Sequence, residues 1–158
     1  MPAESHQRTF QQGLQYLRQN HLAEASNAFR ALFKTEPDEP CYLSYYGLIV
    51  ALHEKNFQDG INFCRAAILR ASCEAELYVN LCRVYARGGQ RKKALETLVE
   101  GLKFASDKPS ILTEMRRMGC RRKPVLRFLP RDHFLNKSLG KFTYQFRKTA
   151  ASPTELRR

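Results

Sequence analysis

Apolar residues recur at helical spacing over the first three quarters of the chain, and short polar turns separate the apolar runs. Phe10, Leu14 and Leu17 lie three or four residues apart, which puts them on one face of a helix over about residues 4–20. The same spacing predicts six more helices, over about residues 22–35, 40–54, 57–71, 74–87, 91–105 and 109–118. Proline and glycine residues fall between several of these segments, as expected where helices end. The pattern therefore predicts an all-α protein.

The predicted helices form pairs that repeat about every 34 residues. One position in the first helix of each pair holds a small residue, Gly13, Gly47 and Cys82, at spacings of 34 and 35 residues. A matching position in the second helix is also small, at Ala25, Gly60 and Ala94. Small residues let paired helices cross closely, and a fixed period of this length is typical of an α-helical solenoid. We therefore expect about three helix pairs and one additional helix, over residues 6–39, 40–74, 75–108 and 109–118.

The residues at the repeated positions resemble the motif of the tetratricopeptide repeat family. The first copy reads Gly13, Tyr16, Ala25, Phe29, Leu32 and Pro37. The second copy reads Leu43, Tyr46, Gly47, Val50, Gly60, Cys64 and Ala67. The third copy reads Tyr78, Leu81, Cys82, Tyr85, Ala94, Leu98 and Gly101. The resemblance covers about residues 6–107. It implies a right-handed α-solenoid with a concave groove, in a non-enzymatic adaptor or scaffold that holds a segment of another protein.

In this family the first helix of each pair lines the concave face. The groove residues that the resemblance implies are Phe10, Leu14, Leu17, Arg18, Leu48, Leu52, Val79, Arg83 and Arg87. This surface is apolar at one end and basic at the other, so it would suit an extended or helical segment with apolar anchors and a carboxylate. In the alternative interpretation, the apolar groove residues only pack on the chain's own terminal segments.

One subgroup of the family binds C-terminal carboxylates through lysine and asparagine side chains on the first helices. The matching positions here are Phe10, Leu14, Ser44 or Tyr45, Val79 and Arg83. Only Arg83 agrees with that pattern. We therefore predict that the chain lacks a chaperone-type carboxylate clamp.

Basic residues are concentrated in the last third of the chain. The net charge is +12, yet residues 1–107 hold 13 Lys and Arg against 12 Asp and Glu, whereas residues 108–158 hold 14 against 3. Such asymmetry predicts a near-neutral repeat domain, over residues 1–119, and a basic C-terminal extension over residues 120–158. Within the extension, apolar residues share one face of a predicted amphipathic helix over residues 132–148.

Three interpretations of the extension stay open. Its apolar stripe could cap the end of the solenoid, because terminal repeats need a polar outer face. Its charge could instead bind a nucleic acid, which would make the protein a nucleic-acid or ribonucleoprotein accessory protein. A third possibility is an anionic membrane surface or an acidic protein. The candidate polyanion-binding residues are Arg116, Arg117, Arg121, Arg122, Lys123, Arg127, Arg131, Lys137 and Lys141.

The sequence lacks the motifs of common catalytic and metal sites. It has no glycine-rich phosphate loop, no HExxH zinc motif and no nucleophile elbow, so we expect no catalytic residue, cofactor or metal. The five cysteines include no CxxC pair and are expected to be small apolar side chains in the core. No apolar run approaches the roughly 20 residues of a membrane-spanning helix, and no secretory signal precedes the first helix. These observations predict a cytoplasmic protein without a transmembrane segment.

Overall fold

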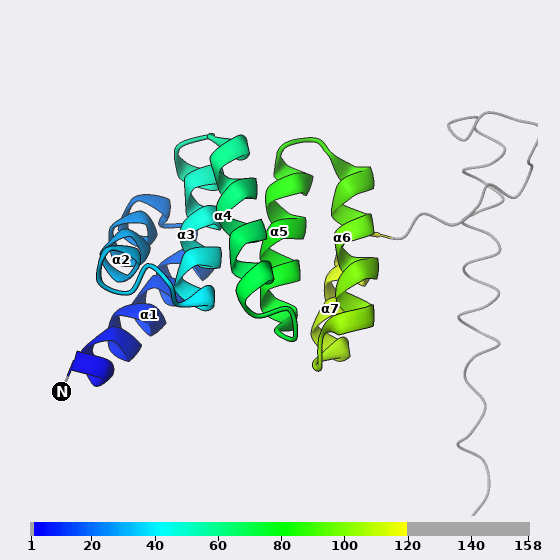
Figure 1. The fold of residues 1–158 in the computed structure, drawn as a ribbon. Coiled ribbons are helices and arrows are strands. Elements are labelled where there is room, and N and C mark those ends of the chain that lie inside the picture. The colour runs from blue at the N-terminus through cyan, green and yellow to red at the C-terminus, as the bar shows by residue number, and fades with distance from the viewer. Residues whose placement is uncertain (1, 120–158) are drawn as a thin grey trace, which may run out of the picture. The chain divides into compact units, whose positions relative to one another are not determined.

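The structure, a computed structural model, describes residues 2–119. Seven α-helices and no strand lie within this range (Figure 1). The helices are α1 (Pro2–Arg18), α2 (Leu22–Thr35), α3 (Pro40–His53), α4 (Phe57–Arg70), α5 (Ala75–Arg87), α6 (Arg91–Phe104) and α7 (Lys108–Arg117). The prediction of an all-α protein is confirmed, and each helix begins and ends within two residues of its predicted bounds. The predicted extension over 120–158, with its helix over 132–148, lies outside the described residues.

The helices stack as consecutive antiparallel pairs. α1 packs on α2, α3 on α4 and α5 on α6, while α3 also contacts α2 and α5 and so joins neighbouring pairs (Figure 1). α7 packs on both α5 and α6, where the first helix of a fourth pair would lie. The predicted solenoid of three pairs and an additional helix is therefore confirmed. No helix of the described range is long and apolar enough to cross a membrane.

The small residues of the repeat lie where paired helices touch. A Cβ atom built on Gly47 of α3 would lie 2.8 Å from the carbonyl oxygen of Gly60 of α4, and one built on Gly60 would lie 2.7 Å from that of Gly47. Real Cβ atoms do not approach other atoms so closely, because the interiors of proteins are packed to van der Waals contact. Both positions therefore need a residue without a side chain if the two helices are to cross at this distance.

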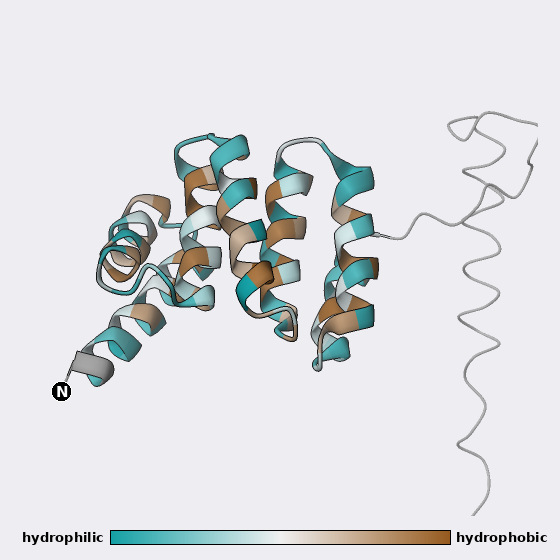
Figure 2. Ribbon diagram, in the orientation of Figure 1, coloured by the Kyte–Doolittle hydropathy of each residue, from teal (hydrophilic) through white to brown (hydrophobic). Residues whose placement is uncertain are grey.

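The core runs through all the helix pairs. Phe29, Tyr78, Leu98 and Ile111 are each at most 1% exposed and belong to a single apolar cluster that extends from α2 to α7. Apolar and polar residues alternate along the helices, and the turn between α3 and α4 is polar (Figure 2). Because Ile111 of α7 is fully buried in this cluster, α7 is an integral part of the repeat domain.

The second pair contains one more residue than the other two between its small positions. From the spacing alone, we expect this residue in the turn over His53–Asn56, where an insertion costs little. In the structure, however, the three turns within the pairs have equal lengths, at residues 19–21, 54–56 and 88–90. The extra residue therefore lengthens α3, which ends at His53, and the turn itself is unchanged. An added residue at the end of a helix leaves the packing of the preceding helical turns unchanged.

Candidate partner-binding site

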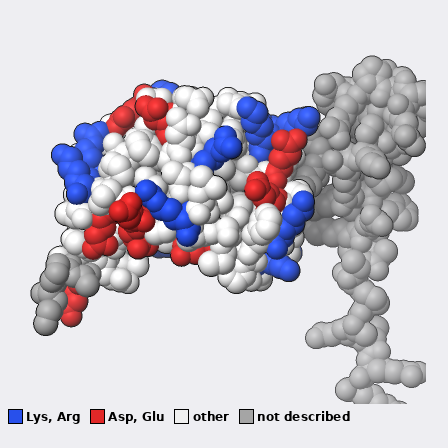
Figure 3. All heavy atoms as spheres, in the orientation of Figure 1, with Lys and Arg blue, Asp and Glu red and all other residues white. Residues whose placement is uncertain are grey.

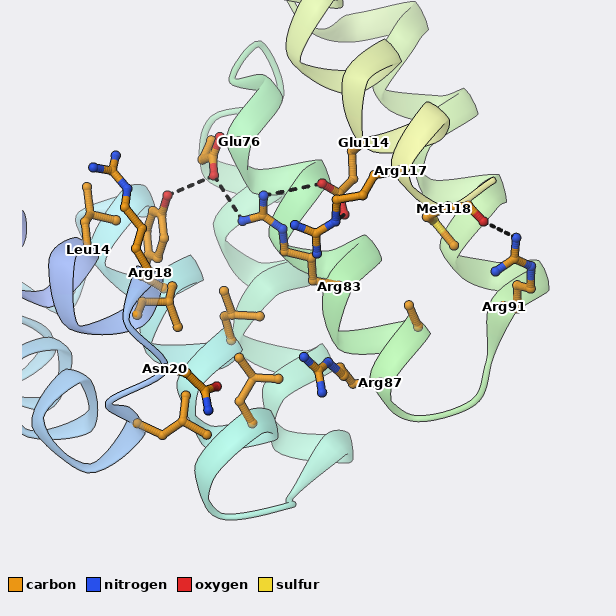
Figure 4. A pocket seen from close by; sticks show the side chains of 16 residues that line it. Leu14, Arg18, Asn20, Glu76, Arg83, Arg87, Arg91, Glu114, Arg117 and Met118 are labelled. Atoms are coloured by element: carbon orange, nitrogen blue, oxygen red, sulfur yellow. Dashed lines mark hydrogen bonds and ion pairs between the residues drawn. The ribbon is translucent and has the colours of Figure 1, made fainter. Parts of the chain in front are cut away.

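A cavity of about 890 Å³ opens on the face formed by the first helices of the pairs. Its lining comes mainly from α1, α3, α5 and α7 (Figure 4). The lining residues are Leu14, Leu17, Arg18, Asn20, Leu22, Tyr45, Leu48, Leu52, Glu76, Arg83, Ala86, Arg87, Arg91, Glu114, Arg117 and Met118. This volume is within the range of cavities that bind ligands in proteins.

Seven of the nine predicted groove residues line this cavity. They are Leu14, Leu17, Arg18, Leu48, Leu52, Arg83 and Arg87. The structure brings them together from three helices because the repeat places the same face of each first helix on the concave side. Their role in binding a partner stays a prediction.

The other two predicted groove residues, Phe10 and Val79, do not line the cavity. The Phe10 ring packs against the rings of Phe29 and Tyr45, with centroids 6.0 Å and 5.3 Å away. Val79 is 2% exposed and lies in the apolar cluster. Phe10 is half-buried and packs against the apolar cluster, whereas Val79 is part of that cluster. Burial of apolar surface stabilises both positions.

Leucine side chains form one end of the cavity. Leu14, Leu17, Leu22 and Leu52 are half-buried and pack on the apolar cluster, and Leu48 is 1% exposed. The four half-buried residues keep apolar surface in contact with solvent. An apolar side chain of a bound segment would remove that surface from water, which is favourable by about 25 cal/mol per Å².

A chain of polar contacts crosses the other end of the cavity. The Tyr45 hydroxyl of α3 donates to Glu76 of α5 at 2.8 Å. The Arg83 guanidinium lies 3.6 Å from that carboxylate and 3.4 Å from the carboxylate of Glu114 on α7. Figure 4 shows Arg83 between these two carboxylates. Arg83 is therefore already paired within the chain.

The Glu114 carboxylate is the most enclosed charge of this set. Its side chain is 8% exposed and lies 3.5 Å from the Nε atom of Arg117 as well as beside Arg83. A buried carboxylate is tolerated only where opposite charges or hydrogen bonds compensate for its lost hydration. The two arginines supply that compensation, so the network links α5 to α7.

Burial controls the protonation of Tyr45. Desolvation raises the pKa of its hydroxyl well above the usual value, and the nearby Glu76 carboxylate raises it further. The hydroxyl therefore keeps its proton near neutral pH and remains a hydrogen-bond donor to Glu76.

The arginines of the cavity differ in how far they are already paired. Arg91 donates to the carbonyl oxygens of Met118 and Gly119, the latter at 2.8 Å. Arg18 and Arg87 have no hydrogen-bond or ion-pair partner for their guanidinium groups among residues 2–119. Both are exposed. These two side chains are thus the arginines of the cavity with donors free for a bound group.

The interpretation of the sequence missed Glu114, Arg117 and Met118 as lining residues. The repeat period itself carried a signal for one of them. Met118 follows Arg83 by 35 residues, the same step that separates Gly47 from Cys82. Extending the alignment by one more copy places Met118 at the register of Arg83, which lines the cavity from α5.

Seven of the nine candidate polyanion-binding residues lie outside the described residues. Of the other two, Arg116 is exposed, and Arg117 lines the cavity and pairs with Glu114. Binding of a nucleic acid or an anionic membrane through this segment stays a prediction.

Comparison with known proteins finds likeness in structure alone. No family model matches the sequence, and no curated protein matches it. Among solved structures, the first tetratricopeptide repeat (TPR) domain of Spaghetti (RPAP3), bound to the HSP90 peptide SRMEEVD, superposes with a TM-score of 0.57 at 14% identity, over 73% of this chain and 93% of that chain. The TPR domain of OM64 from Arabidopsis gives a TM-score of 0.56 at 14% identity, over 75% of this chain and 98% of that chain. The TPR2B domain of yeast Sti1, in a complex with pHsp70, gives a TM-score of 0.55 at 18% identity, over 74% of this chain and 98% of that chain.

The repeat domain has the TPR fold. The resemblance that three degenerate copies of the motif suggest is therefore confirmed at the level of structure. Helix length, pairing and the glycine crossing between α3 and α4 all agree with such a stack of helix pairs.

Proposed function

We propose that this protein is a non-enzymatic adaptor that binds a segment of another protein in its concave cavity. The observation that carries the proposal is that this cavity combines leucine side chains from α1, α2 and α3 with the two unpaired guanidinium groups of Arg18 and Arg87. A segment with apolar anchors and at least one carboxylate complements both parts. Location in the cytoplasm and the absence of catalysis belong to the same proposal.

Arg87 and Arg18 are the residues we propose for recognition of carboxylates. Arg83 is held between Glu76 and Glu114, so a third carboxylate would have to compete with two existing ones. The Arg87 guanidinium has no such competitor among the described residues. A charge-assisted contact to an unpaired guanidinium gains attraction without breaking an ion pair. Arg87 therefore replaces Arg83 as the main candidate.

We further propose that the partner is not gripped by its free C-terminus. Two of the solved TPR domains described above are complexes with an HSP90 peptide and with pHsp70. In this chain the positions that match the carboxylate clamp include Ser44, which is fully buried, and the core residue Val79. Only Arg83 agrees with the clamp, and it is engaged by its own chain. Tight, specific binding of a peptide ending in acidic residues would contradict this part of the proposal.

Affinity capture from native lysate tests the function with matched variants of the full chain. Captured proteins should remain after nuclease treatment and should be lost or strongly reduced with Arg87→Glu, because the substitution reverses an unpaired charge in the cavity. Ala86→Trp should also reduce capture, because Ala86 is exposed and its side chain faces the cavity. Loss of a charged contact at such a site is expected to weaken the binding free energy by about 1–2 kcal/mol.

Arg65→Glu is the control for this experiment. Arg65 is an exposed arginine of α4 that lies outside the cavity, so the same charge reversal there should leave capture unchanged. Equal capture by wild type, Arg87→Glu and Ala86→Trp would reject the cavity as the binding site. Capture that collapses on nuclease treatment would favour the nucleic-acid alternative through the basic extension instead.

A further inference from the structure

The exposed large apolar side chains of the described residues gather on the last two helices. Val99 and Phe104 of α6 are 47% and 58% exposed, and Leu112 of α7 is 40% exposed. The fourth such residue, Leu69, is on α4. Isolated exposed leucines are common, whereas grouped ones mark an interaction surface. The end of the repeat domain formed by α6 and α7 therefore offers apolar surface for a contact.

The outer face of α6 is a shallow hollow of about 540 Å³, which we call the α6 face. It is lined by Lys92, Leu95, Glu96, Val99, Glu100, Lys103 and Phe104. Three apolar side chains thus lie among two basic and two acidic ones. Both signs of charge lie next to one another over α6 (Figure 3).

We infer that the α6 face binds the α6 face of a second copy of this chain, with the two α6 helices antiparallel. A balanced rim of lysine and glutamate complements itself when it is rotated by a two-fold axis. A partner of one charge sign, such as a nucleic acid or a strongly basic segment, would instead oppose half of the rim. The apolar residues between these charges supply the burial that a contact needs.

The spacing along α6 allows a complementary pairing for this contact. In an antiparallel helix pair, facing residue numbers have a constant sum. An axis between Val99 and Glu100 places Glu96 opposite Lys103 of the second copy. The same axis places Leu95 opposite Phe104, and Val99 opposite Glu100, of the second copy. Charge then meets opposite charge twice, apolar meets apolar twice, and each Val99 lies beside the aliphatic stem of a Glu100.

This contact would be separate from the proposed partner site. The α6 face and the concave cavity share no residue. A dimer formed through α6 would therefore present two cavities in one particle, which raises avidity for a partner with two copies of the bound segment. The surface area that one helix face per copy can bury is small compared with the area buried in permanent dimers. The dimer should accordingly be in concentration-dependent equilibrium with the monomer.

Sedimentation velocity of the full chain over a range of concentrations is the test. We expect the dimer fraction to rise with concentration and Val99→Glu to raise the dimer dissociation constant about ten-fold or more. Val99 points outward, so this variant should keep the helical content of the wild type. Leu69→Glu is the control: it places the same charge at an exposed leucine of α4 and should leave the equilibrium unchanged.

A charge exchange tests the pairing itself. Glu96→Lys alone would place lysine against Lys103 in both halves of the dimer, and Lys103→Glu alone would place glutamate against Glu96. Each variant should dimerise more weakly than the wild type. An equal mixture of the two restores opposite charges in both halves, so it should form a heterodimer.

Three results would overturn the inference. One is a monomer at every concentration tested. A second is a dimer that Val99→Glu does not weaken. The third is a monomer in which amides of α6 are protected from hydrogen exchange by another segment of the chain, because the α6 face would then be covered from within.

Discussion

Arg83 of α5 and Glu114 of α7 form an ion pair across 31 residues of sequence, with 3.4 Å between Nη2 and Oε2. The Glu114 side chain is 8% exposed and that of Arg83 is 29% exposed. Removing one partner from an enclosed pair leaves the other charge without compensation, which costs more than the pair itself gains. The contact therefore helps to fix α7 against α5, and it also occupies the Arg83 guanidinium, which lines the cavity.

A double-mutant cycle should show strong coupling between these two residues. We expect Glu114→Gln to lower the free energy of unfolding by about 1–3 kcal/mol, since Arg83 and Arg117 would each lose a charged partner. Combined with Arg83→Gln, the coupling energy should be about 1 kcal/mol or more. Urea unfolding of the wild type, the two single variants and the double variant measures it.

The exposed pair Arg70 and Asp38 is the control for this cycle. Its charged atoms lie 3.0 Å apart, and the Asp38 side chain is 89% exposed. The same cycle there should give about 0.5 kcal/mol or less, because water screens exposed charges. Equal coupling at the two pairs would contradict a structural role for Glu114.

Gly47→Ala should destabilise the fold although alanine favours helix. A Cβ atom at this position would lie 2.8 Å from both the Gly60 carbonyl oxygen and the Cβ of Phe63, so α3 and α4 would have to move apart. The gain in helix propensity is about 1 kcal/mol. The cost of overpacking a core is typically about 1–3 kcal/mol, so a net loss is expected in the free energy of unfolding from urea titration.

Gly88→Ala is the matched control for Gly47. A Cβ atom there would meet the Phe57 ring at 3.4 Å, an ordinary contact, and Gly88 has a φ of −79°. The substitution should change stability by no more than about 0.5 kcal/mol. A loss as large as that of Gly47→Ala would show that the close helix crossing is not the cause.

Lys55→Gly should stabilise the protein. Lys55 follows α3 with a φ of 60°, a left-handed conformation that side chains disfavour and glycine adopts freely. We expect a gain of up to about 1 kcal/mol, reduced by loss of the bond from the lysine amine to the Leu52 carbonyl oxygen. The reciprocal change, Gly89→Lys, should destabilise, because Gly89 has a φ of 75°. Thermal unfolding of both variants measures the two changes in stability. If both variants gain stability, or both lose it, the explanation is contradicted.

Stability should fall as the pH rises above about 9. Burial raises the pKa of the Cys64 thiol from 9.0 to about 12, and burial followed by the nearby Glu114 raises that of Cys82 to about 12. Each thiol then binds its proton more tightly in the folded state than in the unfolded state. The contribution of these two thiols to the free energy of unfolding is present below about pH 9. It is lost progressively as the pH rises toward 12, because only the unfolded chain releases these protons.

Urea unfolding at pH 8 and pH 10 measures this loss, and single cysteine variants assign it. Cys64→Ala should reduce the difference between the two pH values, since the buried thiol no longer titrates. Cys73→Ala serves as the control because Cys73 is exposed. If the stability lost between pH 8 and pH 10 is the same in both variants, other groups cause the loss.

The seven helices could be predicted from the sequence because their cause is local. Spacing of three or four residues, as from Phe10 to Leu14 and Leu17, decides which face is apolar, and breaks at turns decide where a helix ends. The 34-residue period then indicated how the pairs stack. The lining of the cavity was harder to predict, because burial within one helix depends on its neighbours. Val79 and Arg83 are both on α5, yet Val79 is 2% exposed and Arg83 lines the cavity.

The repeat, the helix pairs and the small residues at their crossings can be predicted from the amino-acid sequence, because they depend on neighbouring residues along each helix. Which arginines are free depends on the tertiary structure. Arg83 and Arg87 lie one turn apart on α5 and look equivalent in the sequence. Glu114 comes within 3.4 Å of Arg83, whereas no described carboxylate pairs with Arg87. That difference depends on distances between helices far apart in the chain, and electrostatic pairing falls off over a few ångströms.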